Sequence, residues 1–241
     1  MNCELIPIFD DNYVFVIIDD DHQCAVVIDP GEASAVTKFL LEKKLKLSAI
    51  LLTHHHHDHI GGVEELKNKF ACEVYAPLKN KNQISNANYY VAEAQRITIN
   101  QLTFEVKELP GHTLGHVAYW LEKQAWLFSG DVIFGLGCGR LFEGVPAQMF
   151  ESLSWIKTLP AETKIFCTHE YTQTNLEFTK SILTKAEFAD LVSLADLKKY
   201  EDSLKIPSVP LLLSTQRNLS LFLQTKNLEQ FTKLRQLRNQ F

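Results

Sequence analysis

The chain has 241 residues, of which 46% are hydrophobic and 22% charged, and its formal net charge is −5. This length allows one large domain, or a large domain with a small second one, and the composition excludes a disordered or low-complexity chain. The negative charge disfavours a general nucleic-acid-binding protein, and no apolar run approaches the roughly 20 residues that a membrane-spanning helix needs.

The first 170 residues alternate between short apolar runs, which predict strands, and longer segments, which predict helices. We expect strands at Leu5–Phe9, Tyr13–Ile18, Ala25–Ile28, Ala49–Leu52, Glu73–Ala76, Leu102–Leu109, Val117–Leu121, Ala125–Phe128 and Lys164–Cys167. We expect helices from an N-cap at Ser34 to Lys44, over Gly61–Phe70 and over Gln148–Leu159. This mixture predicts an α/β or α+β domain.

The segment after residue 170 has no strong strand signal. Apolar residues recur every three or four positions from Phe188 to Leu204, which predicts a helical face that Pro207 ends. A last helix is expected over Gln230–Phe241, with Phe231 and Leu234 on one side. We therefore expect a larger domain over 1–170 and a small, mainly helical domain over 171–241.

The cysteines and the start of the sequence indicate an intracellular protein. The five cysteines are widely spaced and form no Cys-x-x-Cys pair, so no disulfide framework is expected. Residues 1–4 begin neither a basic region nor the apolar core of a secretory signal. We expect a cytoplasmic location.

The strongest motif is the run from Thr53 to His59, which reads Thr-His-His-His-His-Asp-His and follows a predicted strand. Alternate residues of an extended loop point the same way, so His54 and His56 can face one cavity, with Asp58 and His59 next in the turn. Imidazole and carboxylate groups suit zinc, iron or manganese. Of the remaining histidines, His55 and His57 alternate away and are expected to be structural, and His22 is expected to be solvated.

Three more ligand-type residues repeat this arrangement. His112, Asp131 and His169 each follow an apolar strand after one or two small or turn-forming residues. One edge of a sheet could therefore gather seven ligands, and seven suit two metal ions better than one.

The motif His-x-His-x-Asp-His, followed by a later His, Asp and His, resembles that of the metallo-β-lactamase superfamily. The resemblance implies a four-layer αββα sandwich with a dinuclear metal site at one edge. It also implies the ligand sets: His54, His56 and His112 for one ion, Asp58, His59 and His169 for the other, and Asp131 as a bridge.

Further segments resemble the glyoxalase II, or hydroxyacylglutathione hydrolase, family, and its bacterial branch most. These segments are Phe9–Tyr13, Pro110–His116, Gly137–Gly144, His169–Thr172 and the tail Arg235–Phe241. The resemblance implies that 171–241 helps to bind glutathione, through Arg140, Tyr171, Arg235 and Arg238. Arg235 and Arg238 are three apart, hence on one helical face, and a guanidinium suits a carboxylate.

Three departures from the family pattern leave the metal ligands untouched. Arg238-Asn239 stands where members often have Lys-Asp, Phe142 stands where many have Tyr, and Gln224 stands where many have Arg. The first two changes affect the expected substrate contacts, and the role of the segment around Gln224 stays open.

The resemblance implies hydrolysis of S-D-lactoylglutathione, and of related S-2-hydroxyacylglutathione thioesters, to D-lactate and glutathione. This is the second step of methylglyoxal detoxification. The expected nucleophile is a metal-bridging water or hydroxide, with Asp58 as a candidate proton acceptor. The expected cofactors are two divalent ions, zinc first and iron or manganese as alternatives. We expect a monomer with a small-molecule substrate and neither a nucleic-acid nor a membrane partner.

Two other enzymes of the same superfamily stay open as alternatives. A glutathione persulfide dioxygenase uses a single iron and a closely similar motif, but its C-terminal segment is shorter. A lactonase of the same fold would not need the basic residues near the C-terminus.

Overall fold

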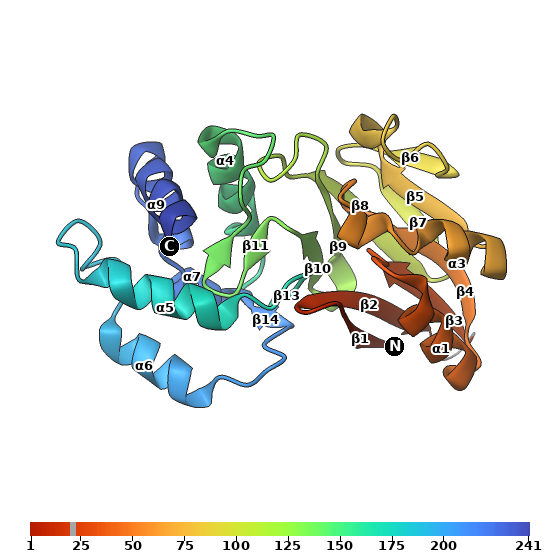
Figure 1. The fold of residues 1–241 in the computed structure, drawn as a ribbon, viewed down its shortest axis with the longest axis horizontal. Coiled ribbons are helices and arrows are strands. Elements are labelled where there is room, and N and C mark those ends of the chain that lie inside the picture. Colours follow the sequence, from red (N-terminus) through yellow and green to blue (C-terminus); the bar gives the residue numbers. More distant parts are fainter. Residues whose placement is uncertain (20–22) are drawn as a thin grey trace. The chain divides into compact units, whose positions relative to one another are not determined.

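The computed structural model describes residues 1–19 and 23–241, so His22 lies outside the described residues (Figure 1). Two compact units divide the chain. One comprises Met1–Glu108, Gly115–Gln124 and Phe128–Gly130, and the other comprises Leu109–Leu114, Ala125–Leu127 and Asp131–Phe241. These spatial units do not test the expected functional boundary near residue 170, which stays a prediction.

The first unit is built on a six-stranded sheet with the strand order β1-β2-β3-β4-β5-β6. The strands are β1 (Asn2–Ile8), β2 (Asn12–Asp19), β3 (Cys24–Ile28), β4 (Lys46–Leu51), β5 (Glu73–Pro77) and β6 (Tyr89–Val91). Strands β1 to β3 pair antiparallel, and β3 to β6 pair parallel. Every residue of β2 is buried, because apolar side chains occupy nearly all its positions.

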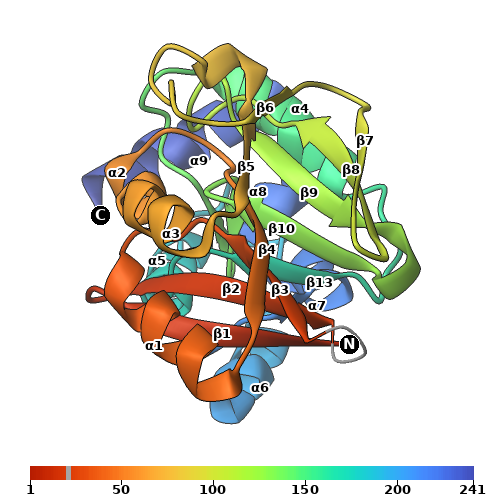
Figure 2. The ribbon, with the colours of Figure 1, turned by 90° about the vertical axis from the view of Figure 1, so that its right-hand side faces the viewer.

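Two helices cover one face of this sheet, α1 (Ala33–Lys43) and α3 (Val63–Phe70) (Figure 2). Their apolar stripes, which include Val36 and Leu66, belong to the same buried cluster as strand residues such as Ile50. The remaining helices of the unit are short, namely α2 (His57–Ile60), η1 (Leu78–Asn80) and η2 (Glu122–Gln124).

The second sheet has the strand order β14-β13-β10-β9-β8-β7. Its strands are β7 (Arg96–Ile99), β8 (Leu102–Glu108), β9 (Val117–Leu121), β10 (Trp126–Gly130), β13 (Lys164–Cys167) and β14 (Leu211–Leu212). Strands β7, β8 and β9 form an antiparallel meander. A small hairpin, β11 (Ile133–Phe134) and β12 (Gly137–Cys138), belongs to the second unit.

The second unit is mainly helical. Its helices are α4 (Pro146–Ile156), α5 (Thr172–Leu183), α6 (Leu194–Ser203), α7 (Leu213–Leu219), α8 (Leu221–Gln224) and α9 (Leu228–Gln240). An aromatic core joins them: the ring of Phe231 in α9 lies 5.6 Å from Phe150 in α4 and 5.9 Å from Phe222 in α8. Burial of such rings dominates the stability of a small helical core.

Two local expectations were wrong. Helix α1 is capped by Glu32 and not by Ser34, because the Glu32 carboxylate accepts the Ala35 amide at 3.2 Å. The helical face expected from Phe188 begins only at α6, because the Ser193 hydroxyl caps that helix. Phe188 is nevertheless buried in the preceding turn.

The described residues contain no helix that is both long and apolar enough to cross a membrane. All five cysteines are free.

Candidate metal centre

The loop after β4 brings two histidines of the first unit together. His54 is fully buried, and its Nε2 lies 3.0 Å from Nδ1 of His56. The opposite nitrogen of His54 lies 3.1 Å from the Thr53 hydroxyl. The two imidazole nitrogens face each other across a shared proton. A metal cation can replace that proton and bind both nitrogens.

His59, in the same loop, is held by a carboxylate that the sequence reasoning missed. The buried Asp29 accepts from His59 Nδ1 at 3.0 Å, from the Thr53 amide at 2.7 Å and from the Thr53 hydroxyl at 2.6 Å. Because a carboxylate only accepts, Nδ1 of His59 carries the proton and Nε2 is left as the ligand atom. That Nε2 lies 3.5 Å from Oδ2 of Asp58, which also accepts from Asn12 at 2.9 Å.

The second unit contributes His112, Asp131 and His169, all of them buried. One oxygen of Asp131 lies 3.4 Å from Nε2 of His112 and 3.4 Å from Nε2 of His169. One carboxylate oxygen of Asp131 thus faces two imidazole nitrogens. Behind His169, the ring of Tyr171 stacks at 4.9 Å and 3°.

His112 is oriented by a backbone carbonyl. Its Nδ1 lies 2.8 Å from the Arg140 carbonyl oxygen, which can only accept. Nδ1 therefore carries the proton, and Nε2 is the nitrogen available to a metal. The set of buried imidazoles and carboxylates, without thiolate, suits zinc, iron or manganese.

The structure places the other two histidines of the run differently. His55 directs Nδ1 to the Asn80 amide at 3.0 Å, and the side chain of His57 is exposed. Sequence reasoning also left His116 unassigned, and its ring stacks on His54 with centroids 4.8 Å apart.

The basic residues expected to contact glutathione lie in the second unit. Arg140 is exposed, with its guanidinium 5.9 Å from the ring of Phe142. Arg238 is half-buried, and its Nε donates to Asn175 at 3.0 Å. Arg235 is only 5% exposed and donates from one terminal nitrogen to the Cys138 carbonyl at 2.8 Å. The three cations are therefore not equivalent.

Cys138 offers no nucleophile. Burial raises the pKa of its thiol, although the nearby Arg235 opposes this shift. The thiol therefore stays protonated near neutral pH, as a small buried hydrophobic group.

Comparisons with known proteins found relatives over most of the chain. The family model described as the metallo-beta-lactamase superfamily matches residues 8–169. A hydroxyacylglutathione hydrolase of Bdellovibrio bacteriovorus is 55% identical over 98% of this chain and 96% of its own length. A hydroxyacylglutathione hydrolase of Salmonella gallinarum is 41% identical over 95% of this chain and 89% of its own length.

The fold itself has solved relatives. The crystal structure of ETHE1 from Myxococcus xanthus covers 98% of this chain and 90% of its own, with a TM-score of 0.74 and 23% identity. That identity supports the fold alone. The expected metallo-β-lactamase fold with a helical C-terminal region is confirmed, and the chain belongs to the hydroxyacylglutathione hydrolase family of the metallo-β-lactamase superfamily.

Proposed function

We propose that this enzyme hydrolyses S-D-lactoylglutathione and related S-2-hydroxyacylglutathione thioesters to D-lactate and glutathione, the second step of methylglyoxal detoxification. The observation that carries the proposal is the 55% identity, over 98% of the chain, to a protein named for this activity. The seven ligand-type residues expected for the metal site are all present and include no substitution.

We propose two divalent ions, zinc first and iron or manganese as alternatives. Pairs within each unit support this: His54 with His56 and His59 with Asp58 in the first unit, and Asp131 with His112 and with His169 in the second. By the ligand sets that the family resemblance implies, His54, His56 and His112 would hold one ion, and Asp58, His59 and His169 the other. Asp131 would be the bridge. Bound divalent ions lower the pKa of water toward neutrality and polarise a carbonyl oxygen, which is the chemistry that thioester hydrolysis needs.

The chain's own side chains prepare this chemistry. Asp29 and the Arg140 carbonyl each hold Nδ1 of one imidazole, which orients Nε2 of His59 toward Asp58 and Nε2 of His112 toward Asp131. Asp58 is the proposed proton acceptor. Its side chain is 38% exposed, so a proton taken up there can pass to solvent.

We propose that the carboxylate of glutathione binds Arg140, Arg235 and Arg238, with Tyr171 against the peptide. Arg238 donates from Nε to Asn175, and its guanidinium lies near the rings of Phe178 and Phe241. A guanidinium can still offer its two terminal nitrogens to a carboxylate as a donor pair. Arg235 also donates to backbone carbonyls.

We also propose that the enzyme acts in the cytoplasm as a monomer. Five free cysteines suit a reducing compartment. The partner is a small molecule in this proposal.

The test follows loss of the thioester absorbance of S-D-lactoylglutathione, with metals counted in the same sample. We expect fast loss with about two metals per chain. His54→Ala and Asp131→Ala should each lose metal and nearly all turnover, whereas His57→Ala, in the same histidine run but exposed, should keep both.

Two outcomes would replace the proposal. A single iron per chain, with oxygen uptake on glutathione persulfide and no thioester cleavage, would indicate the dioxygenase. Hydrolysis of lactones without thioester cleavage would indicate the lactonase.

A further inference from the structure

We propose that Arg235 of α9 is a positioning residue for the metal ligands, in addition to its expected contact with the substrate carboxylate. It holds the loop Cys138–Arg140, and this loop in turn holds His112 and Asp131. The inference rests on the proposed function, because it assigns Arg235 a role in that same site.

The guanidinium of Arg235 is buried and occupied. One terminal nitrogen lies 2.8 Å from the Cys138 carbonyl and 3.4 Å from the Gly139 carbonyl. The other terminal nitrogen donates to Asn239 at 2.9 Å, and the ring of Phe222 lies 5.4 Å from the guanidinium carbon. A charged donor fixed on two sides and stacked on a ring holds its acceptors firmly in place.

The contacts of Arg235 assign a role to the segment around Gln224, which the sequence left open. Phe222 of α8 supplies the ring under Arg235, and it packs against Phe231 of α9. Gln224 itself donates to the Arg217 carbonyl. The segment thus supports Arg235 through packing.

The loop that Arg235 holds touches two candidate ligands. Next to Gly139, the Arg140 carbonyl accepts from His112 at 2.8 Å. Gly139 packs so closely on the Asp131 backbone that a Cβ there would lie 2.0 Å from the Asp131 carbonyl oxygen. The Gly139 amide also donates to the Val132 carbonyl at 3.1 Å. A displacement of the loop would therefore move both ligands.

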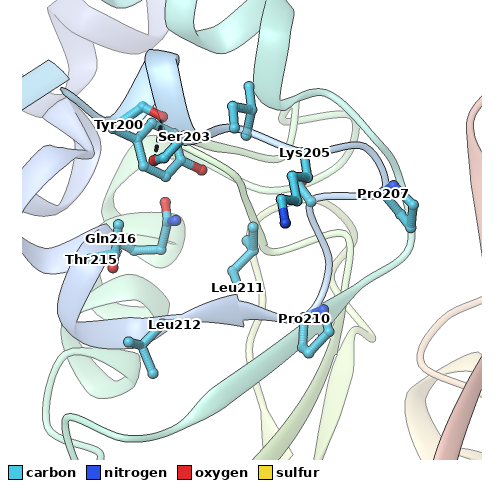
Figure 3. Close-up of a pocket in the computed structure, with 11 residues that line it drawn as sticks. Tyr200, Ser203, Lys205, Pro207, Pro210, Leu211, Leu212, Thr215 and Gln216 are labelled. Carbon is cyan, nitrogen blue, oxygen red and sulfur yellow. Dashed lines mark hydrogen bonds between the residues drawn. The ribbon is translucent and has the colours of Figure 1, made fainter. Parts of the chain in front are cut away.

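Two further side chains from the helical region hold the hairpin that leads into this loop. Asn175 donates to the Gly135 carbonyl at 2.9 Å, and Gln216 accepts the Leu136 amide at 2.8 Å. Gln216 is 1% exposed, and it lines a cavity of about 250 Å³ together with Tyr200 (Figure 3). Residues after 170 thus support metal ligands in addition to the substrate role expected of them.

The two roles of Arg235 predict different kinetics. A residue that binds only the remote carboxylate should raise KM when it is removed, with kcat and metal affinity kept. Removal of a residue that holds the support of a metal ligand should in addition weaken metal binding and lower kcat. Loss of an outer-shell partner typically costs 10–100-fold in metal affinity or activity.

The experiment measures the zinc dissociation constant, by competition with a chromophoric chelator, alongside kcat and KM for S-D-lactoylglutathione. For Arg235→Met we expect a zinc dissociation constant about 10–100-fold higher and a lower kcat, together with the rise in KM that loss of a substrate contact brings. Arg235→Lys keeps one charged donor and should recover part of the loss. Lys233→Met removes an exposed cation from the same helix and should change nothing.

A rise in KM of tenfold or more, with zinc affinity and kcat intact, would overturn the proposal, and so would no change in any of the three. If Arg235→Met does not fold by circular dichroism, Arg235→Lys and Asn239→Ala carry the same test, because Asn239 orients the guanidinium. The zinc competition needs no substrate. An inactive wild-type enzyme would therefore refute the proposed reaction and still leave the role of Arg235 measurable.

Discussion

Replacement of Asp29 should cost the protein much of its stability, although Asp29 is not a candidate metal ligand. Its buried carboxylate accepts from the Thr53 amide, the Thr53 hydroxyl and His59 Nδ1, at 2.7, 2.6 and 3.0 Å. Each buried donor left without an acceptor costs about 1–3 kcal/mol, so Asp29→Ala should lose roughly 3–9 kcal/mol. The Thr53 hydroxyl can rotate and His59 can change tautomer, so both can find other partners. We therefore expect a loss at the lower end of this range. Even a loss of about 3 kcal/mol is a large part of the free energy of unfolding of a typical protein, which is about 5–15 kcal/mol.

The assay is guanidinium unfolding with the metals chelated, so that only the protein's own contacts are compared. Asp29→Asn should fall between wild type and Asp29→Ala, because an amide oxygen still accepts the Thr53 amide but its NH₂ group cannot accept from the other two donors. Asp10→Ala, which removes an exposed carboxylate, should stay within about 0.5 kcal/mol of wild type. A loss below about 1 kcal/mol for Asp29→Ala would refute this account of the three hydrogen bonds.

Two further predictions concern a glycine and a cysteine. Gly139→Ala should lower the metal content per chain and kcat together, because its Cβ would lie 2.0 Å from the Asp131 carbonyl; wild-type metal content would contradict this. Burial raises the pKa of Cys72 from 9.0 to about 11, so the folded thiol keeps its proton after the unfolded one has ionised. Its contribution is present below pH 9 and is lost as pH rises to about 11, so unfolding midpoints should fall over that range more in wild type than in Cys72→Ala. An equal dependence of the unfolding midpoint on pH in wild type and Cys72→Ala would contradict this account.

The candidate ligands could be predicted because their chemistry and their position are both visible locally. Four of them follow an apolar run after one or two residues, where a strand ends: His54, His112, Asp131 and His169. The other three follow His54 in the same turn, and few roles other than metal binding explain such a set of seven. The fold class followed from the mixture of strand and helix patterns, and the family motif then narrowed it.

The supports of the ligands could not be predicted, because tertiary contacts alone determine them. In the sequence, Asp29 is one residue of an Asp-Pro-Gly turn, and only the folded chain brings it to Thr53 and His59. The strands β7 and β14 and the helices α7 and α8 were missed for a related reason. They are short, and packing rather than periodicity stabilises them.

The tail shows why a correct family pattern can still leave residue roles open. Arg235 and Arg238 share one face of α9, so helical spacing predicts one role for both. Burial separates them: Arg235 is 5% exposed and donates to loop carbonyls, whereas Arg238 is half-buried and donates from Nε to Asn175. Helical spacing predicts which face of the helix a residue occupies, but the burial of its side chain decides whether that side chain can reach solvent.

The two oriented histidines are supported by groups of different charge, which makes the Asp29 and Arg235 variants complementary. His59 donates to the carboxylate of Asp29, which raises the basicity of the imidazole, whereas His112 donates to a neutral backbone carbonyl. Loss of Asp29 therefore changes both the charge and the position of a ligand. Loss of Arg235 leaves the partner of His112 chemically the same and acts on it through the position of the loop. A fall in metal affinity in Arg235→Lys, which keeps the positive charge, would thus measure geometry, and any larger fall after loss of Asp29 would include the added effect of ligand basicity.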